Sequence, residues 1–299
     1  LTEKPMIAHY DPYYHGLETR LELSLGEWNQ MAGGLPEGSF VLGLTSIHWR
    51  ESWKYGERAF RYCQHDTGHA LACLQAAAMM LGWEVRRLDY FSSTQIETIL
   101  GVGGQVGHEK EHGACLLAVV PRATLPKDRA PVLHCGDGFF HALAHREWKG
   151  EANQLSSFHH NWSIISFVRE AVVEGEWTPD SFTNQEPFRD SQSSPIAVQG
   201  AAHAKLATDV IRGRRSAVSM DGETAMSIDD FYRLLWRVHP VLNDGFFTGL
   251  RFETNIALVL FIHRVEGVVP GLYLFCRGSH QPAELKQAMR PGFEWSTPL

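Results

Sequence analysis

Residues 70–81 read Ala-Leu-Ala-Cys-Leu-Gln-Ala-Ala-Ala-Met-Met-Leu, and this run of small and apolar side chains decides the fold. Ala, Leu, Met and Gln are strong helix formers, and Gly82 follows as a helix stop. Asp66 stands upstream as a candidate N-cap. Because the run is apolar on every side of a helix, we expect this helix to lie buried in the middle of a domain.

Apolar runs before and after this helix predict strands. Residues 37–48 indicate a short buried strand bounded by glycine, and residues 115–120 a strand buried on both faces that ends before Pro121. Residues 254–265 indicate a third strand. Further helices are expected over 162–174 and after Ser227, where Asp230 completes a start resembling a capping box. Helices that alternate with buried strands indicate an α/β or α+β class.

The composition excludes several classes of protein. The 299 residues are 44% hydrophobic and 20% charged, with a net charge of −7, so neither a disordered chain nor a basic nucleic-acid binder is expected. The longest apolar stretch, 256–262, is much shorter than a membrane helix of about 20 residues. Five scattered cysteines without a Cys-x-x-Cys pair favour a reducing compartment, and we expect a cytoplasmic protein or one imported into an organelle.

A faint internal repeat suggests two copies of one domain. It has an offset of 265 residues and pairs the positions Pro5, Tyr10 and His15 with Pro270, Phe275 and His280. The first copy would span 1–150 and lack its N-terminal part, and 205–299 would be the N-terminal part of a second copy. Residues 151–204 would connect them, with the polar stretch 178–194 as a linker or surface loop.

Three clusters of side chains could carry chemistry. Lys54 and Tyr55 are adjacent, and a cation next to a phenol can support proton transfer; the alternative is the solvated face of an amphipathic helix. Lys127 and Arg129 follow Pro126 and suit a terminal phosphate, unless they belong to an ordinary charged loop.

The third cluster consists of Arg212, Arg214, Arg215 and Ser216. Arginines next to a hydroxyl can hold a phosphate and the carbonyl edge of a heterocycle. The alternative is a basic helix end, which the helix dipole stabilises without any ligand.

Residues 108–112, His-Glu-Lys-Glu-His, match the zincin pattern H-E-x-x-H. That motif requires a helix that puts both imidazoles on one face, and glycines surround it here at 101, 103, 104, 107 and 113. We therefore expect a loop and no metal. The pairs His141/His145 and His159/His160 are interpreted as histidines that satisfy core hydrogen bonds.

Taken together, these segments resemble the nitroreductase-like flavoproteins, and most closely the SagB-type (thiazole/oxazole) dehydrogenase branch. The most specific match is residues 53–82, from Trp-Lys-Tyr-Gly-Glu-Arg-Ala-Phe-Arg-Tyr into the Ala-rich run. The resemblance implies an α+β fold with a mixed sheet flanked by helices, and FMN at a subunit interface. It assigns the dehydrogenase step to Lys54 and Tyr55, and it assigns FMN contacts to Lys127, Arg129, Arg214, Arg215 and Ser216, with Arg212 as a further phosphate contact.

The resemblance also implies a function. The chain would transfer a hydride between FMN and a small-molecule or peptide heterocycle, or reduce nitroaromatics and quinones with NAD(P)H as electron donor. It would act as a homodimer or a pseudo-dimer, with Leu71, Leu74 and Ala78 forming an apolar wall beside the flavin. Val218 replaces the basic residue that the family usually has two positions after the signature serine. This departure keeps open an alternative: a catalytically degenerate subunit with a structural or partner-binding role.

Overall fold

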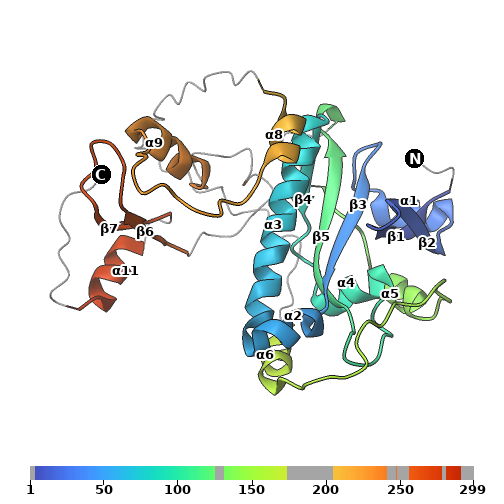
Figure 1. Cartoon of the computed structure of the whole chain (residues 1–299). Coiled ribbons are helices and arrows are strands. Elements are labelled where there is room, and N and C mark those ends of the chain that lie inside the picture. Colours follow the sequence, from blue (N-terminus) through green and yellow to red (C-terminus); the bar gives the residue numbers. More distant parts are fainter. Residues whose placement is uncertain are drawn as a thin grey trace. The chain divides into compact units, whose positions relative to one another are not determined.

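The computed structural model describes residues 4–124, 131–173, 205–240, 247, 256–277 and 281–290. These residues form an α+β fold (Figure 1). The chain divides into two compact units: unit 1 is Leu1–Gln185 with Thr248–Arg251, and unit 2 is Glu186–Phe247 with Phe252–Leu299. No helix in the described ranges is long and apolar enough to cross a membrane.

Unit 1 is built on a three-stranded sheet in the order β3-β5-β4. The central strand β5 (His112–Pro121) pairs antiparallel with β3 (Phe40–Ser46) and with β4 (Trp83–Arg87). Residues 115–120 of β5 are buried, so the strand predicted there is confirmed. A strand is also present within 37–48, but the residues of β3 are half-buried or exposed, so the prediction that this strand is buried is wrong. Every pair of named strands in the described residues is antiparallel, which differs from the mixed sheet that we expected.

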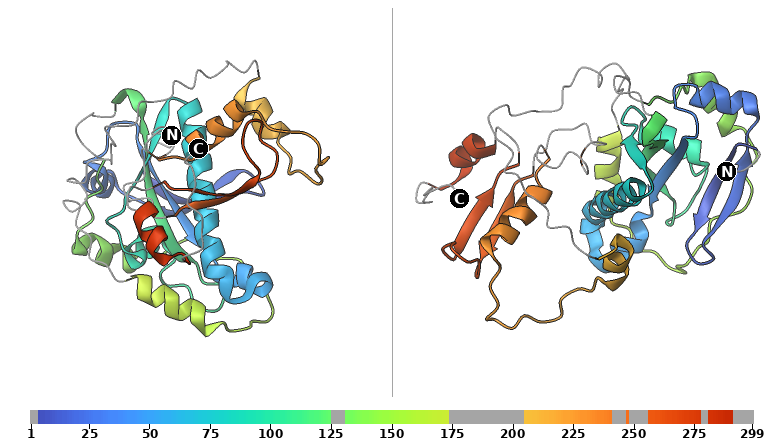
Figure 2. Two further views of the ribbon diagram at one scale, coloured as in Figure 1. Left: turned by 90° about the vertical axis from the view of Figure 1, so that its left-hand side faces the viewer. Right: turned by 90° about the horizontal axis from the view of Figure 1, so that it is seen from above.

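The Ala-rich run lies in α3 (Ala59–Met80), which crosses one face of this sheet (Figure 2). Leu71, Leu74 and Ala78 pack there against a core cluster made of Val85, Cys115, Leu117 and Val119. The opposite side of α3 is exposed, so the prediction of a helix buried all round is wrong for the described part of unit 1. The sheet covers only one side of α3, and the small side chains on the other side of the helix are exposed.

The ends of α3 are set by local backbone geometry. Gly82 has a φ of 76°, a left-handed conformation that glycine adopts without strain, so the predicted stop is confirmed. The predicted N-cap at Asp66 is wrong. The helix begins at Ala59, directly after the 3-10 turn η1 (Gly56–Arg58), and Asp66 lies exposed within it.

The second face of the sheet is covered by α4 (Ser93–Leu100), α1 (Leu25–Ala32), α5 (Asp137–Ala144) and the hairpin of β1 (Met6–Asp11) and β2 (Gly16–Glu22) (Figure 2). Together they bury the larger core of unit 1: Leu21, Leu23, Met31, Leu88, Ile96, Ile99, Leu116, Ala118, Val120, Leu133, Phe139 and Leu143.

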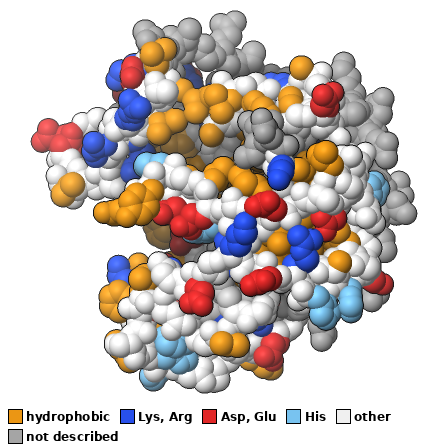
Figure 3. Space-filling model, turned by 90° about the vertical axis from the view of Figure 1, so that its right-hand side faces the viewer, with side chains coloured by type: hydrophobic (Ala, Val, Ile, Leu, Met, Phe, Trp, Pro, Cys, Tyr) orange, Lys and Arg blue, Asp and Glu red, His pale blue; other side chains and the backbone are white. Residues whose placement is uncertain are grey.

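Ion pairs tie the hairpin side of unit 1 to the chain after α5. Lys149 Nζ lies 2.9 Å from a carboxylate oxygen of Glu22, and Arg146 Nη1 lies 2.7 Å from one of Glu27. Figure 3 shows acidic and basic side chains interspersed among apolar ones over that face. These exposed pairs contribute little to stability individually.

Three short helical elements complete unit 1. The helix α2 (His48–Tyr55) leads through η1 into α3, and η2 (Arg122–Thr124) follows β5. The helix α6 (Ser163–Val173) packs against α3 and confirms the helix predicted over 162–174.

Unit 2 contains α8 (Ala207–Gly213), α9 (Ile228–Arg237), β6 (Leu258–Ile262), β7 (Gly271–Phe275) and α11 (Gln281–Ala288). The Ser227 side chain accepts a hydrogen bond from the Asp230 backbone N–H at 3.1 Å, which confirms the predicted start of α9. Strand β6 is shorter than the predicted strand over 254–265, of which residues 254 and 255 lie outside the described residues. A small core of Phe231, Leu235, Ile262 and Val268 joins α9 to the β6–β7 hairpin.

The repeat offset of 265 residues aligns strand with strand at one place. It matches β1, which begins at Met6, with β7, which begins at Gly271. Further along it matches the strand β2, beginning at Gly16, with the helix α11, beginning at Gln281. The similarity of the two copies therefore extends over one strand in the described residues, and the division of the chain into copies of one domain stays a prediction.

Candidate functional site

Lys54 and Tyr55 end α2, where the chain turns into α3. Lys54 is exposed and Tyr55 is half-buried. The Lys54 ammonium lies 5.1 Å from the centroid of the Tyr55 ring, within range of a cation–π contact, and the Tyr55 ring packs 4.4 Å from that of Tyr62. The structure thus brings the two predicted catalytic residues together at an accessible corner.

The backbone after Tyr55 requires glycine. Gly56 has φ 59° and ψ −139°, a region that L side chains rarely adopt. A Cβ at this position would also lie 3.2 Å from the Trp162 ring, which packs directly on the corner. Trp162 comes from the segment before α6, so a part of the chain distant in sequence fixes the direction of α2 relative to α3.

The buried carboxylate of Glu109 binds Arg50 on the other side of α2. Arg50 donates from Nε and Nη2 to one oxygen of Glu109, at 3.0 and 2.9 Å. The backbone N–H groups of Leu155 and Ser156 donate to the other oxygen, at 2.9 and 2.6 Å. Burial of Glu109 opposes its ionisation, but these donors and the Arg50 charge outweigh burial and lower its pKa to about 2.

Glu109 belongs to the stretch that matches the zincin pattern. Residues 108–111 are not helical and His112 begins β5, so the predicted loop is confirmed. His108 stacks on His159 with 5.0 Å between ring centroids, while His112 stacks on His48. In the described ranges no group of His, Cys, Asp and Glu is arranged to hold a metal ion.

The predicted FMN contacts of unit 2 lie at the end of α8 and just after it. Arg212, Arg214, Arg215 and Ser216 are all exposed. Arg215 Nη1 donates to the carbonyl oxygens of Arg212 and Arg214, both at 2.8 Å, and Arg214 Nη1 lies 3.5 Å from Ser216 Oγ. No ion pair neutralises these three guanidinium groups among the described residues. Such a donor set fits a phosphate or another anionic oxygen.

The remaining site predictions have different outcomes. Lys127 and Arg129 lie outside the described residues. Lys54 and Tyr55 belong to unit 1, and the arginine cluster belongs to unit 2. Leu71, Leu74 and Ala78 pack against the sheet core, and their predicted role as a wall beside a flavin stays a prediction.

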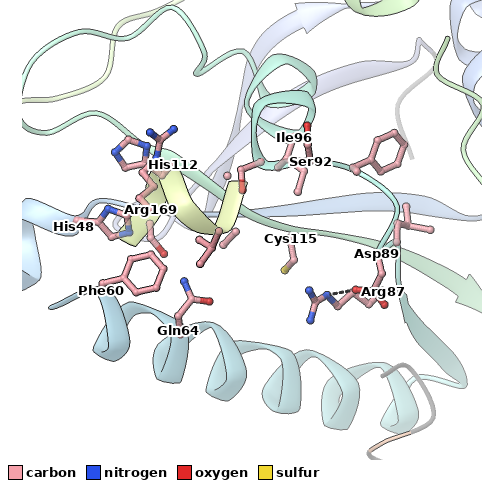
Figure 4. Close-up of a pocket in the computed structure, with 17 residues that line it drawn as sticks. His48, Phe60, Gln64, Arg87, Asp89, Ser92, Ile96, His112, Cys115 and Arg169 are labelled. Carbon is pink, nitrogen blue, oxygen red and sulfur yellow. Dashed lines mark ion pairs between the residues drawn. The ribbon is translucent and has the colours of Figure 1, made fainter. Parts of the chain in front are cut away.

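A cavity of about 370 Å³ lies in unit 1 beside α3 and was not anticipated from the sequence. Figure 4 shows Gln64 pointing from α3 into it, His48 and His112 at one end, and Arg87 with Asp89 at the other. The lining residues are Ser46, His48, Phe60, Gln64, Arg87, Leu88, Asp89, Phe91, Ser92, Ser93, Ile96, His112, Gly113, Ala114, Cys115, Arg169 and Val172.

Burial keeps the histidines of this cavity neutral. Burial, together with the nearby His112 and Arg169, lowers the pKa of His48 to about 4. The pKa of His112 is also lowered by burial and by Arg169, against the opposing effect of Glu97. Burial raises the pKa of the Cys115 thiol to about 11, so this thiol is not a thiolate nucleophile at neutral pH.

The signals for this cavity in the sequence are weak. His48 is the last residue of the strand predicted over 37–48, and His112 precedes the strand over 115–120, but no spacing rule places the two side by side. Comparison of the chain with family models, curated proteins and solved structures gives no match.

Proposed function

We propose that the chain is an FMN-dependent oxidoreductase of the nitroreductase-like, SagB-type group, transferring a hydride between the flavin and a small-molecule or peptide heterocycle. The observation that carries the proposal is the motif over 53–82. Its residues fold as one continuous unit, α2–η1–α3, with the Lys54–Tyr55 pair at the exposed corner. The α+β class and the long helix on an antiparallel sheet support the same proposal.

FMN, when bound, supplies the hydride acceptor and donor. The residues of this chain would bind and orient it. Arg214 and Arg215 would hold the anionic oxygens or the pyrimidine edge, with Ser216 as a further donor, and Arg212 would contact the phosphate. Lys127 and Arg129 are the other phosphate contacts that the resemblance implies. The guanidinium groups of Arg212, Arg214 and Arg215 fit this role because they are exposed and form no ion pair within the part of the chain that the structure describes.

Lys54 and Tyr55 would act on the substrate. The phenol oxygen of Tyr55 would accept or donate the proton that accompanies hydride transfer, with the Lys54 ammonium near the Tyr55 ring. Trp162 against Gly56 and Arg50 on Glu109 would keep the corner in place while the proton moves.

A homodimer or pseudo-dimer is part of this proposal. The side of α3 that faces away from the sheet exposes Ala72, Cys73, Ala77, Met80 and Leu81, of which Leu81 is 75% exposed. Small side chains on an exposed helix face allow the close approach of another helix, and burial of this face would favour association.

The colour of the purified protein tests the proposal. We expect the purified protein to be yellow and to release FMN on heat denaturation. In an activity assay, NAD(P)H is the first electron donor to test. Colourless protein that binds no FMN when titrated with an excess, measured by quenching of flavin fluorescence, would contradict it.

The second candidate function is a degenerate subunit with a structural or partner-binding role. Val218 favours it, because this fully exposed valine stands where the family usually has a basic residue. The flavin titration separates the two functions, since a degenerate subunit would stay colourless.

A further inference from the structure

The cavity of unit 1 is separate from the residues proposed to hold FMN. Neither Lys54, Tyr55 nor the arginine cluster lines it. Its volume of about 370 Å³ is in the lower part of the range of small-ligand sites, roughly 300–1,000 Å³. It is bounded by α3, α4, α6 and the start of β5.

One end of the cavity carries a buried donor without an acceptor. Arg169 Nε makes no hydrogen bond among the described residues, while Arg169 Nη2 donates to Glu97 at 3.2 Å and His112 Nδ1 lies 3.4 Å from the same Glu97 oxygen. Gln64 adds an amide that points into the space from α3 (Figure 4). Buried donors in native proteins normally have an acceptor, so this end is suited to a ligand that brings oxygen acceptors.

The charge balance at this end favours an anion. Glu97 is 3% exposed and is shared by Arg169 at 3.2 Å, Lys110 at 3.7 Å and His112. Of these four groups, Arg169 and His112 line the cavity, whereas Glu97 and Lys110 do not. At the other end Arg87 and Asp89 pair with each other, so the excess positive charge lies beside the histidines.

Part of the cavity wall is apolar. Phe60 from α3, Ile96 from α4 and Val172 from α6 line it, together with Phe91 and Ala114. A bare inorganic anion would leave these walls without contacts, whereas an anion with an apolar body would bury them.

We propose that this cavity binds a small organic carboxylate with an aromatic or aliphatic body. The carboxylate lies at the end formed by His48, His112 and Arg169. The body packs on Phe60, Ile96 and Val172.

Binding at this end is coupled to protonation. The charged and titratable groups around the carboxylate are Glu97 from α4, Lys110 from the loop before β5, Arg169 from α6, and the two histidines from α2 and β5. A carboxylate placed beside neutral imidazoles favours their charged form. Proton uptake therefore accompanies binding, and the affinity rises as the pH falls below neutral, until the ligand's own carboxyl group begins to take up a proton.

Benzoate tests the proposal, with binding measured by isothermal titration calorimetry on the whole chain. We expect saturable binding that is stronger at lower pH, takes up protons, and is roughly tenfold tighter than that of acetate, because the ring adds apolar burial. The substitution Gln64→Glu places a negative charge in the cavity at an exposed helix position that does not threaten folding, and it should weaken benzoate roughly tenfold. The matched control Gln30→Glu, exposed on α1, should leave the affinity unchanged.

Arg169 gives a second, independent test. Arg169→Gln should weaken benzoate at least as much as Gln64→Glu, and Arg169→Lys should restore most of the affinity. No heat with millimolar benzoate at any pH would overturn the proposal, as would equal affinities of the Gln64→Glu and Gln30→Glu variants. Equal binding of acetate and benzoate would overturn the assignment of an apolar body. If Arg169→Gln fails to fold, the Gln64 comparison still decides.

Discussion

His48 stacks on His112 with 4.9 Å between the ring centroids and 19° between the ring planes. The first residue begins α2 and the second begins β5, so this contact links the helix that carries Lys54 and Tyr55 to the central strand. Both rings are held neutral by burial, with Arg169 acting in the same direction. Two stacked imidazoles beside a guanidinium are stable only while neither takes up a proton.

We predict that unit 1 loses stability in mild acid because of this pair. The pKa of His48 falls from 6.5 to about 4 on folding, so the unfolded chain binds the extra proton between these values. The stabilising contribution is complete above pH 6.5 and is lost as the pH falls toward 4, by up to about 3 kcal/mol for His48. Urea unfolding followed by circular dichroism at a series of pH values measures it.

The variant His48→Gln should reduce the dependence of unfolding free energy on pH in this window. His69→Gln is the control, because His69 is exposed on α3 and its removal should leave the slope unchanged. An identical slope in wild type and His48→Gln would show that the buried pair is not the source.

Gly56 and Gly68 make a matched pair of glycines with opposite expected effects. At Gly56, φ is 59° and a Cβ would meet the Trp162 ring, so Gly56→Ala should destabilise the protein by roughly 1–3 kcal/mol. At Gly68, in the middle of α3, a Cβ would meet nothing within 4 Å, so Gly68→Ala should stabilise by roughly 0.5–1 kcal/mol. Chemical denaturation measures the free energy of unfolding of both variants. If Gly68→Ala is destabilised and Gly56→Ala is unchanged, the backbone at Gly56 does not require glycine.

Much of unit 1 was predictable from local sequence. The strand over 115–120 is apolar at every position because it is the middle strand, and Gly82 ends α3 because its backbone is left-handed. The burial of α3 was not predictable, because an alanine-rich helix has the same sequence pattern whether one or both of its sides are covered. The prediction of Asp66 as an N-cap was wrong because α3 begins earlier, directly after the turn at Gly56–Arg58. An exposed Asp inside a long helix lowers the stability of the helix only slightly, so Asp66 does not end it.

The candidate site was only partly predictable. Lys54 and Tyr55 are neighbours in sequence, so their proximity follows from the chain itself. The contacts of His48 with His112 and of Arg50 with Glu109 join segments far apart in sequence, and their pairing depends on how α2 packs beside β5. No periodicity or spacing encodes such tertiary contacts.

Lys54→Ala and Tyr55→Phe should abolish turnover without loss of flavin. Lys54 is exposed and Tyr55 keeps its ring contact with Tyr62 as phenylalanine, so neither change should disturb folding. Loss of a positioned proton-transfer group typically lowers kcat by roughly 10²–10⁴-fold. The assay is NAD(P)H oxidation with a quinone or nitroaromatic acceptor, and flavin content is read from the visible spectrum. Arg61→Ala, on the exposed side of α3, is the control. Loss of flavin in both variants would mean that the corner holds the cofactor instead.

The exposed face of α3 leads to the last prediction. We expect the protein to form dimers through this face, because Ala72, Cys73 and Ala77 present little side-chain bulk and the helix end adds the apolar Met80 and Leu81. Ala77→Glu places a charge in the centre of the face and should shift the protein to monomer in sedimentation velocity experiments, since a buried unpaired carboxylate is costly. Ala142→Glu makes the same change at an exposed position of α5 and should leave the dimer intact. A monomeric wild type, or a dimer that persists in Ala77→Glu, would show that α3 is not the interface, and the exposed apolar side chains would then need another explanation.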